Sequence, residues 1–466
     1  MALRNDSRHR GALAPAAAFA LGALFVASAG AAPLKVPYQS FTLDNGLKVI
    51  LHEDHSVPVI SVNTWFHVGS GDEKPGRTGF AHLFEHIMFM GSRNVPTGDF
   101  DKLLEASGAN NNGSTTEDRT NYYEDGPSNA LPLMLWLDSD RMGHLLPEIT
   151  AEKVDLQRGV VQNERRQSYE NQPYGLAEEN ILKRLYPAEH PYHWPVIGSM
   201  ADLSAATIED VREFFTKYYA PNNATVCIAG DIRPAETRRL VESWFGDIPR
   251  GPGITRPDAP AFTLPADVHA TLEDRVQVPR VYNAWHSTKS WAGDDAALQV
   301  MGQVLAGGKT SRLYKRLVYD LQIANQVAAY QDAGRLDGKF VIFSTARPGH
   351  GLNELQRVID DEVGRLAAAG PTPRELERVK NSIEAEFIGG MERVGGFGGK
   401  ANQLNNYDYF AGEPDSFERD LDRYRAVGAA DVQRVAGRYL AQAKRVVLSV
   451  VPQGKTDLAV TQGVQP

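Results

Sequence analysis

Two distant segments of the chain share one structural plan. Residues 210–230 (DVREFFTKYYAPNNATVCIAG) and residues 431–451 (DVQRVAGRYLAQAKRVVLSVV) each begin with Asp-Val, continue as an amphipathic helix with a tyrosine near its end, and finish as a β-branched strand. A weaker similarity joins VNTWFH (62–67) with VYNAWH (281–286). Because both pairs have similar offsets along the chain, the sequence predicts two homologous domains.

Length and turn signals place the boundaries of these domains. A chain of 466 residues is long for one domain and suits two. The Pro- and Gly-rich segment 248–265 is typical of a linker, so we expect a first domain over 38–247, a second over 266–455 and a tail over 456–466. Helical patterns and antiparallel strand signals are segregated. This predicts an α+β fold in which each domain packs helices on one face of a mostly antiparallel sheet.

The charge of the chain argues against nucleic acid as a partner. The formal net charge is -9 and no dense run of Lys or Arg occurs, whereas nucleic-acid binders carry a basic face. With 42% hydrophobic and 23% charged residues, the composition is that of an ordinary globular protein. We therefore expect no nucleic-acid partner.

The first 31 residues have the pattern of a bacterial secretory signal peptide. Three arginines precede an apolar stretch over 12–26, and Ala29 and Ala31 stand at the small-residue positions of a cleavage site. We expect cleavage after Ala31, a periplasmic location and no membrane span in the mature chain. The alternative is an uncleaved membrane anchor, which the short apolar stretch disfavours.

The stretch GFAHLFEHIMFMGS (79–92) interrupts an apolar run with His82, Glu85 and His86. Burying two imidazoles and a carboxylate is costly unless a partner satisfies them. On a helix, residues four apart lie about 40° apart and one turn along, so His82 and His86 aim at one point. This geometry is typical of a bidentate metal clamp, and Glu85 lies near enough to act on a water in the same site.

A catalytic zinc site needs a third protein ligand and a position left open for water. Three apolar residues mark the expected buried face of a long helix further along the chain: Leu156, Val160 and Val161. Glu164 falls on the same face, where a core residue is expected, and Gln157 is placed to hydrogen-bond a metal ligand from behind. The alternative for Glu164 is a surface glutamate on an amphipathic helix, and Glu152 and Asp155 are the next candidates for the third ligand.

These motifs resemble those of the pitrilysin/insulinase family of zinc metallopeptidases, also called inverzincins. The resemblance also rests on TNYY (120–123) and YYAPNNATVCIAGD (218–231), and it covers nearly the whole chain after the signal. It is strongest to the bacterial two-domain type, which is similar to the subunits of mitochondrial processing peptidase. The resemblance implies Zn²⁺ as the cofactor, with His82, His86 and Glu164 as its ligands and Glu85 as the general base.

The segment NNGSTTEDRTNYY (111–123) is similar to the family's edge strand near the metal. An extended peptide adds to such an edge as a further strand. The resemblance therefore implies a peptide substrate that contacts Asn112 and Thr115.

The chain also departs from the family pattern. Gln157 stands where many relatives have an acid, so the support of the metal ligands is expected to be weaker or different. Val318 and Asn325 stand where relatives carry an Arg and a Tyr that hold the substrate carbonyl, and the second half has LQVMGQVL (298–305) in place of a metal motif. We therefore expect a homodimer or a heterodimer, the latter with a homologous subunit that carries the Arg/Tyr pair.

The sequence thus predicts a periplasmic zinc endopeptidase that acts on peptides or unfolded protein segments. Two alternatives stay open. One is a non-catalytic or assembly subunit of the same fold, which the intact metal motif disfavours. The other is a zinc hydrolase with a non-peptide substrate, which the resemblance over the whole chain disfavours.

Overall fold

The structure is a computed structural model that describes residues 34–259 and 261–461. Residues from Lys35 onward form one compact unit. The predicted signal peptide over 1–31 lies outside the described residues. Within the part of the chain that the structure describes, no helix is both long and apolar enough to cross a membrane.

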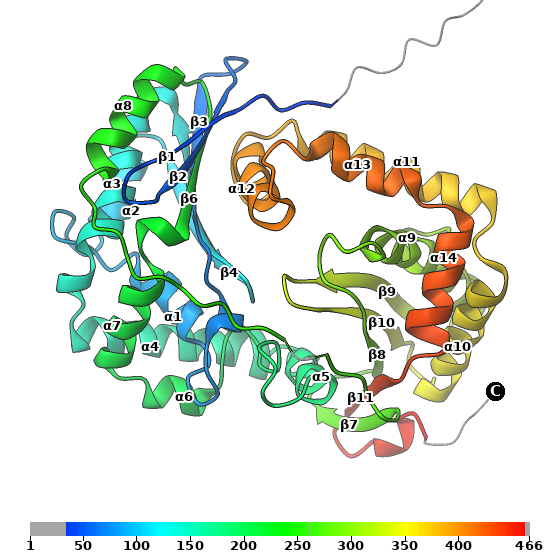
Figure 1. Ribbon diagram of the computed structural model, residues 1–466. Helices are drawn as coiled ribbons and strands as arrows, with labels where there is room; N and C mark the ends of the chain where they lie inside the picture. The colour runs from blue at the N-terminus through cyan, green and yellow to red at the C-terminus, as the bar shows by residue number, and fades with distance from the viewer. Residues whose placement is uncertain (1–33, 260, 462–466) are drawn as a thin grey trace, which may run out of the picture. The chain divides into compact units, whose positions relative to one another are not determined.

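The first half of the chain builds a six-stranded sheet (Figure 1). Its strands follow the order β1-β2-β6-β3-β5-β4, and only the pair β2 and β6 is parallel. The bounds are β1 Gln39–Thr42, β2 Lys48–Glu53, β3 Val59–Phe66, β4 Asn110–Thr115, β5 Thr120–Pro127 and β6 Ala224–Gly230. Strand β4 therefore lies at one edge of this sheet.

The second half builds a five-stranded sheet with the order β7-β11-β8-β10-β9. Again one pair, β7 and β11, is parallel and the other pairs are antiparallel. The bounds are β7 Val268–Asp274, β8 Arg280–His286, β9 Ala324–Ala333, β10 Gly338–Ala346 and β11 Arg445–Pro452.

The two sheets repeat one topology down to the register of their strands. Leaving β1 aside, each strand of the first sheet has a counterpart at the same place in the second. Phe66 lies opposite Ala224, and the residues aligned with them in the sequence repeats, Trp285 and Arg445, lie opposite each other too. The predicted duplication and the α+β fold class are therefore confirmed.

The helices follow the same division of the chain. Those of the first half are α1 Phe80–Ile87, α2 Asp99–Ala106, α3 Leu131–His144, α4 Ala151–Arg165, α5 Ala177–Leu185, α6 Met200–Ala205, α7 Ile208–Tyr218 and α8 Pro234–Phe245. Those of the second half are α9 Asp295–Ala306, α10 Leu352–Ala369, α11 Pro373–Gly390, α12 Lys400–Ala411, α13 Phe417–Ala426 and α14 Ala429–Val435.

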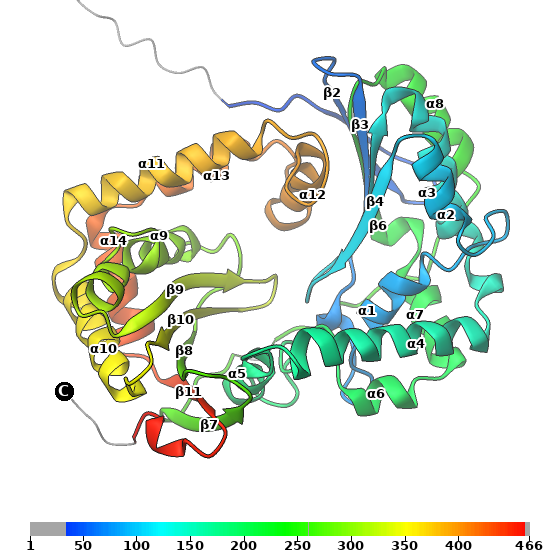
Figure 2. The same cartoon turned by 180° about the vertical axis from the view of Figure 1, so that it is seen from behind.

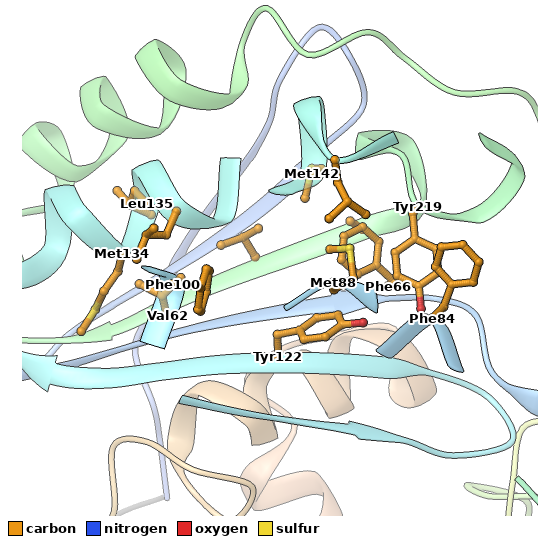
Figure 3. Packing of buried hydrophobic residues seen from close by; sticks show 14 of the residues in the cluster. Val62, Phe66, Phe84, Met88, Phe100, Tyr122, Met134, Leu135, Met142 and Tyr219 are labelled. Atoms are coloured by element: carbon orange, nitrogen blue, oxygen red, sulfur yellow. The ribbon is translucent and has the colours of Figure 1, made fainter. Parts of the chain in front are cut away.

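The core of the first half fills the space between its sheet and its own helices. Successive side chains on a strand point to opposite faces, and Val62 and Phe66 of β3 point to the face that these helices cover. The Phe66 ring lies 4.6 Å from that of Tyr219, which lies 5.1 Å from the ring of Phe84 on α1 (Figure 3). The metal-binding motif is thus carried by a helix that is anchored in this core.

The opposite face of each sheet receives one helix from the other half. Helix α12 packs on β3 and β6 (Figure 2). There Asn405 donates a hydrogen bond to the Asn63 carbonyl at 2.8 Å, and Trp65 donates to Asn402 at 2.9 Å. Helix α5 packs on β8 and β11 of the second sheet, and its Ile181 belongs to the cluster under those strands. This exchange of helices joins the two halves through buried surface.

The segment predicted as a linker, 248–265, contains no helix or strand among its described residues. It is nevertheless fastened to the first half, because Arg256 donates hydrogen bonds to the His67 carbonyl and, at 2.5 Å, to the Asn223 amide oxygen. The domain boundaries given above stay predictions.

Replacing Arg141 is expected to destabilise the first half strongly. The buried Arg141 of α3 pairs with Asp138 and, at 2.7 Å, with Glu124 of β5, and its guanidinium lies 4.5 Å from the Tyr122 ring centroid. Arg141→Met leaves two buried carboxylates without their cation, which costs about 3–5 kcal/mol. Urea unfolding measures this loss. Lys102→Met, at an exposed position, is the control and is expected to change the free energy of unfolding by less than about 1 kcal/mol. An equally small loss for Arg141→Met would show that Arg141 does not stabilise the two buried carboxylates.

Candidate metal centre

Helix α1 presents both motif histidines to one side. It runs from Phe80 to Ile87 and buries Leu83 and Phe84 in the core, which leaves His82 and His86 on the other side of the helix. The two imidazole rings lie 4.8 Å apart, in an edge-to-face arrangement. The spacing of the motif therefore produces the paired imidazoles that it predicts.

The start of α1 is held by a carboxylate that the sequence analysis did not single out. Gly79 stands at the N-cap with a φ of 88° and has no side chain to cap the helix. Instead, the buried Glu73 accepts hydrogen bonds from the backbone N–H groups of Gly79 at 3.0 Å and Ala81 at 2.7 Å. The sequence signal is the glycine at the N-cap position, where Ser, Thr, Asp or Asn is preferred, because free N–H groups at a helix start need an acceptor.

Glu164 of α4 lies opposite the two histidines. Its Oε2 atom is 3.4 Å from His86 Nε2 and 3.8 Å from His82 Nε2, and one ligand atom from each residue lies within 4.8 Å of the others. In a tetrahedral zinc site with bonds of about 2.0–2.1 Å, ligand atoms lie about 3.4 Å apart. Two imidazole nitrogens and one carboxylate oxygen at these distances fit a zinc ion, with room for a further ligand on the cavity side.

The buried face of α4 differs from the one that the sequence predicts. Leu156 and Val160 were expected on the buried face of α4, but their exposed fractions are 56% and 41%. The buried face is formed by Val154, Val161 and Arg165. Glu164 itself is 39% exposed at the side chain, because α4 turns that side toward the cavity and not toward the core.

Glu85 lies beside the three candidate ligands without joining them. Its Oε2 atom accepts a hydrogen bond from Thr115 Oγ1 at 2.6 Å and is 4.0 Å from His82 Nε2. Burial raises the pKa of Glu85, with the Thr115 hydrogen bond acting in the opposite direction. A carboxylate whose pKa is moved toward neutrality and whose position is fixed is suited to accept a proton from water.

Gln157 lies behind His86, as predicted. Its amide nitrogen is 2.7 Å from Met90 Sδ, and its side chain also hydrogen-bonds His86. Burial lowers the pKa of His86, but the hydrogen bond to Glu164, the nearby carboxylates and the Gln157 contact raise it, and the net shift is upward. Gln157 thus orients an imidazole although it lacks the charge of an acid.

A cavity of about 650 Å³ opens over this cluster. All seven residues that the sequence assigned to the site line it: His82, Glu85, His86, Asn112, Thr115, Gln157 and Glu164. The lining also includes Tyr169, which the sequence analysis missed because a lone tyrosine in the polar stretch RQSYENQP carries no motif. Every lining residue belongs to the first half of the chain.

Strand β4 forms one wall of the cavity. Among the strands of the described residues, β4 pairs with β5 alone, so its outer edge is unpaired there. The half-buried Arg119 donates hydrogen bonds to the Ser114 carbonyl at 2.8 Å and to Ser114 Oγ at 2.6 Å. Beyond the strand, Asp118 accepts hydrogen bonds from the Tyr192 hydroxyl at 2.6 Å and from the Arg335 N–H of the second half at 2.8 Å. These contacts hold the strand next to Glu85.

The residues that stand at the family's Arg and Tyr positions lie elsewhere. Val318 lies in a π-helical turn, Tyr314–Asp320, and packs against the core of the second half. Asn325 lies on β9, where its amide nitrogen is 3.4 Å from the Ala346 carbonyl. Neither residue lines the cavity over the cluster.

Removing the Thr115 hydroxyl is expected to slow hydrolysis while leaving metal binding unchanged. Thr115→Val keeps the shape of the side chain but releases the Glu85 carboxylate, and the loss of such a supporting contact typically costs about 10- to 100-fold. Measurements of kcat/KM and of bound zinc separate the two effects. Thr216→Val on α7 is the matched control, since its hydroxyl bonds only the Arg212 carbonyl in its own helix. An unchanged kcat/KM for Thr115→Val would show that the hydrogen bond between Thr115 and Glu85 does not contribute to hydrolysis.

Two family models match successive parts of the chain. Residues 48–193 match the model described as insulinase (peptidase family M16). Residues 205–383 match the model described as peptidase M16 inactive domain. The first match contains the motif histidines, and the second contains most of the half that lacks them.

Similar proteins span the same length. Zinc protease PqqE of Helicobacter pylori is 27% identical over 420 residues, which cover 89% of this chain and 93% of that protein. Mitochondrial-processing peptidase subunit beta of Blastocladiella emersonii is 24% identical over 437 residues, 90% of each chain. A crystal structure of a protease from Helicobacter pylori has a TM-score of 0.83 at 26% identity and covers 90% of this chain and 100% of that one. The chain belongs to the insulinase family of peptidases, family M16.

Proposed function

We propose that this protein is a zinc-dependent endopeptidase that hydrolyses peptides or unfolded protein segments in the periplasm. The observation that supports this most strongly is the convergence of His82, His86 and Glu164 on one point, with Glu85 beside it. The cavity over these residues is bordered by an unpaired sheet edge, which suits an extended peptide. Membership of a family whose named relatives are zinc proteases gives further support.

His82 and His86 would hold the zinc through Nε2 and Glu164 through its carboxylate. Three protein ligands leave one position open, which is the arrangement of catalytic and not of structural zinc sites. When bound, zinc supplies a Lewis acid that polarises the scissile carbonyl and acidifies water.

Glu85 would act as the general base. Its carboxylate accepts a proton from the attacking water as the water oxygen bonds to the carbonyl carbon. When the carbon–nitrogen bond breaks, Glu85 returns this proton to the leaving amine. The Thr115 hydrogen bond to Oε2 fixes the carboxylate, so its position does not depend on the substrate.

The substrate would add to β4 as a further strand. Main-chain hydrogen bonds to an unpaired edge give affinity with loose side-chain preference. A Cβ atom at Gly113 would lie 3.0 Å from Glu85 Oε1, so the glycine lets the strand approach the general base closely. Asn112 is exposed on this strand, next to Gly113, and is available to contact the peptide.

Digestion of a mixed peptide library, followed by mass spectrometry, tests this function. The zinc-loaded protein is expected to cut peptide bonds inside the chains, to stop after a chelator removes the metal, and to recover when zinc is restored. If the zinc-loaded protein cuts no peptide, alone or with a co-expressed homologue, the endopeptidase proposal fails. Fractionation of cells tests the periplasmic location, and a purely cytoplasmic product would contradict it.

We also propose that the working form is a dimer, either of two copies or with a homologous subunit that carries the missing Arg/Tyr pair. The support is that only first-half residues line the cavity and that Val318 and Asn325 lie away from it. The mass in solution and the rate of hydrolysis are measured with and without the homologue. Full activity as a monomer contradicts both forms, and full activity as a homodimer contradicts the mixed one.

A further inference from the structure

Peptide hydrolysis in this cavity needs a donor for the oxygen of the scissile carbonyl, an inference that rests on the proposed function. Negative charge grows on that oxygen as water adds, and removing one donor aimed at it costs about 10²- to 10³-fold in rate. Val318 and Asn325 do not line the cavity. If this chain supplies such a donor itself, the donor is one of the other cavity side chains.

Two hydroxyl groups in the cavity wall are already engaged. Thr115 Oγ1 donates its hydrogen to Glu85 at 2.6 Å. Ser114 Oγ donates to Asn121 Oδ1 at 2.6 Å, on the adjacent strand. Each hydroxyl has one hydrogen, so neither is free to donate to a substrate.

The two amides of the cavity wall each have one N–H directed to another protein group, although an amide nitrogen carries two hydrogens. The Gln157 amide nitrogen is 2.7 Å from Met90 Sδ, and its side chain also bonds a metal-site histidine. The Asn112 side chain hydrogen-bonds the Tyr123 hydroxyl on β5. In contrast, Tyr169 lines the same cavity, and its hydroxyl makes no hydrogen bond within the described part of the chain.

Tyr169 is held in a local structure that suits a fixed role. It lies in a π-helical turn, Arg166–Glu170, directly after α4, and π-helical turns within helices are frequent at functional sites. The guanidinium of Arg165 lies 6.0 Å from the tyrosine ring centroid and is itself bonded to Glu179 at 2.7 Å. Gly175 packs on the Tyr169 carbonyl so closely that a Cβ atom there would lie 2.2 Å from its oxygen.

We propose that Tyr169 is a catalytic residue whose hydroxyl donates a hydrogen bond to the scissile carbonyl oxygen as that oxygen becomes negatively charged. The pKa of a tyrosine hydroxyl is ordinarily about 10, so the phenol carries its proton at neutral pH and can donate it in a hydrogen bond. No proton leaves the phenol during the reaction. Tyr169 belongs to the half of the chain that carries the metal-site histidines. In the resembled family, the Arg/Tyr pair that holds the carbonyl oxygen belongs to the other half.

Tyr169→Phe tests this assignment in the active assembly, whether that is the chain alone or the dimer. We expect kcat to fall about 100-fold with KM and bound zinc nearly unchanged, because the contact forms only as charge develops. A second readout is the binding of a phosphonate peptide, whose tetrahedral, negatively charged centre resembles the transition state. Its affinity should fall by a similar factor, while the affinity for an uncleaved substrate in the Glu85→Gln background stays the same.

Tyr174→Phe is the matched control. Its hydroxyl donates to the Val278 carbonyl at 2.8 Å, away from the cavity, so kcat and phosphonate binding should match the parent. Parent-like kcat and phosphonate affinity in Tyr169→Phe overturn the inference while leaving the proposed function intact. Loss of zinc in Tyr169→Phe also overturns it, since the tyrosine would then act through the metal. A parent that cleaves no peptide overturns the proposed function, and this inference with it.

Discussion

Glu85→Gln is expected to bind zinc as the parent does and to lose nearly all peptide hydrolysis. The amide preserves the size of the side chain and can still accept the Thr115 hydrogen bond through its oxygen, but it cannot take up a proton. General-base catalysis alone typically contributes about 10²- to 10⁴-fold. The measurements are kcat on a cleaved peptide and zinc content in the same preparation, so that a loss of rate is not confused with a loss of metal.

The exposed Glu105→Gln on α2 is the control for this substitution, since it makes the same change of charge away from the cavity. Its kcat should equal that of the parent. Turnover in metal-loaded Glu85→Gln within about 10-fold of the parent would remove Glu85 from the role of general base.

Glu164→Ala and His86→Ala are expected to lose the metal itself. Each substitution removes one of three donors that converge within 4.8 Å. Loss of a group that merely supports a ligand costs about 10- to 100-fold in metal affinity, so loss of a ligand should cost more than about 100-fold. Competition with a chelator of known zinc affinity measures this change. Hydrolysis should disappear at the zinc concentrations that saturate the parent.

Glu152 and Asp155, the other acids considered for the third ligand, give the controls. Both are exposed near the start of α4, neither lines the cavity, and Asp155 pairs with Arg158 at 2.6 Å. Their alanine variants should bind zinc as the parent does. Parent-like zinc affinity in Glu164→Ala, with a loss in either control, would reassign the third ligand.

The sequence predicts those features of the site and the fold that depend on residues close together along the chain. His82 and His86 lie four residues apart on one helix, and helical spacing alone brings their rings together. The repeats at 210–230 and 431–451 likewise predicted two homologous halves, and the equivalent strand register of the two sheets agrees with this prediction.

The parts that could not be predicted depend on contacts between distant segments. The apolar residues of α4 predict a buried face that includes Leu156 and Val160, but both are exposed, and only the fold shows that Glu164 faces the cavity. Periodicity also could not show that α5 and α12 each cover the sheet of the other half. Tyr169 enters the site through an irregular turn, which hydrophobic patterns do not reveal.

Anomalous diffraction at the zinc absorption edge, from crystals of the purified zinc-loaded protein, tests whether His82, His86 and Glu164 hold the metal. We expect one strong peak at about 2.0–2.2 Å from His82 Nε2, His86 Nε2 and a Glu164 carboxylate oxygen, with Glu85 next to it and not bound to it. A peak at other residues, or no peak between α1 and α4, would rule out this set of ligands.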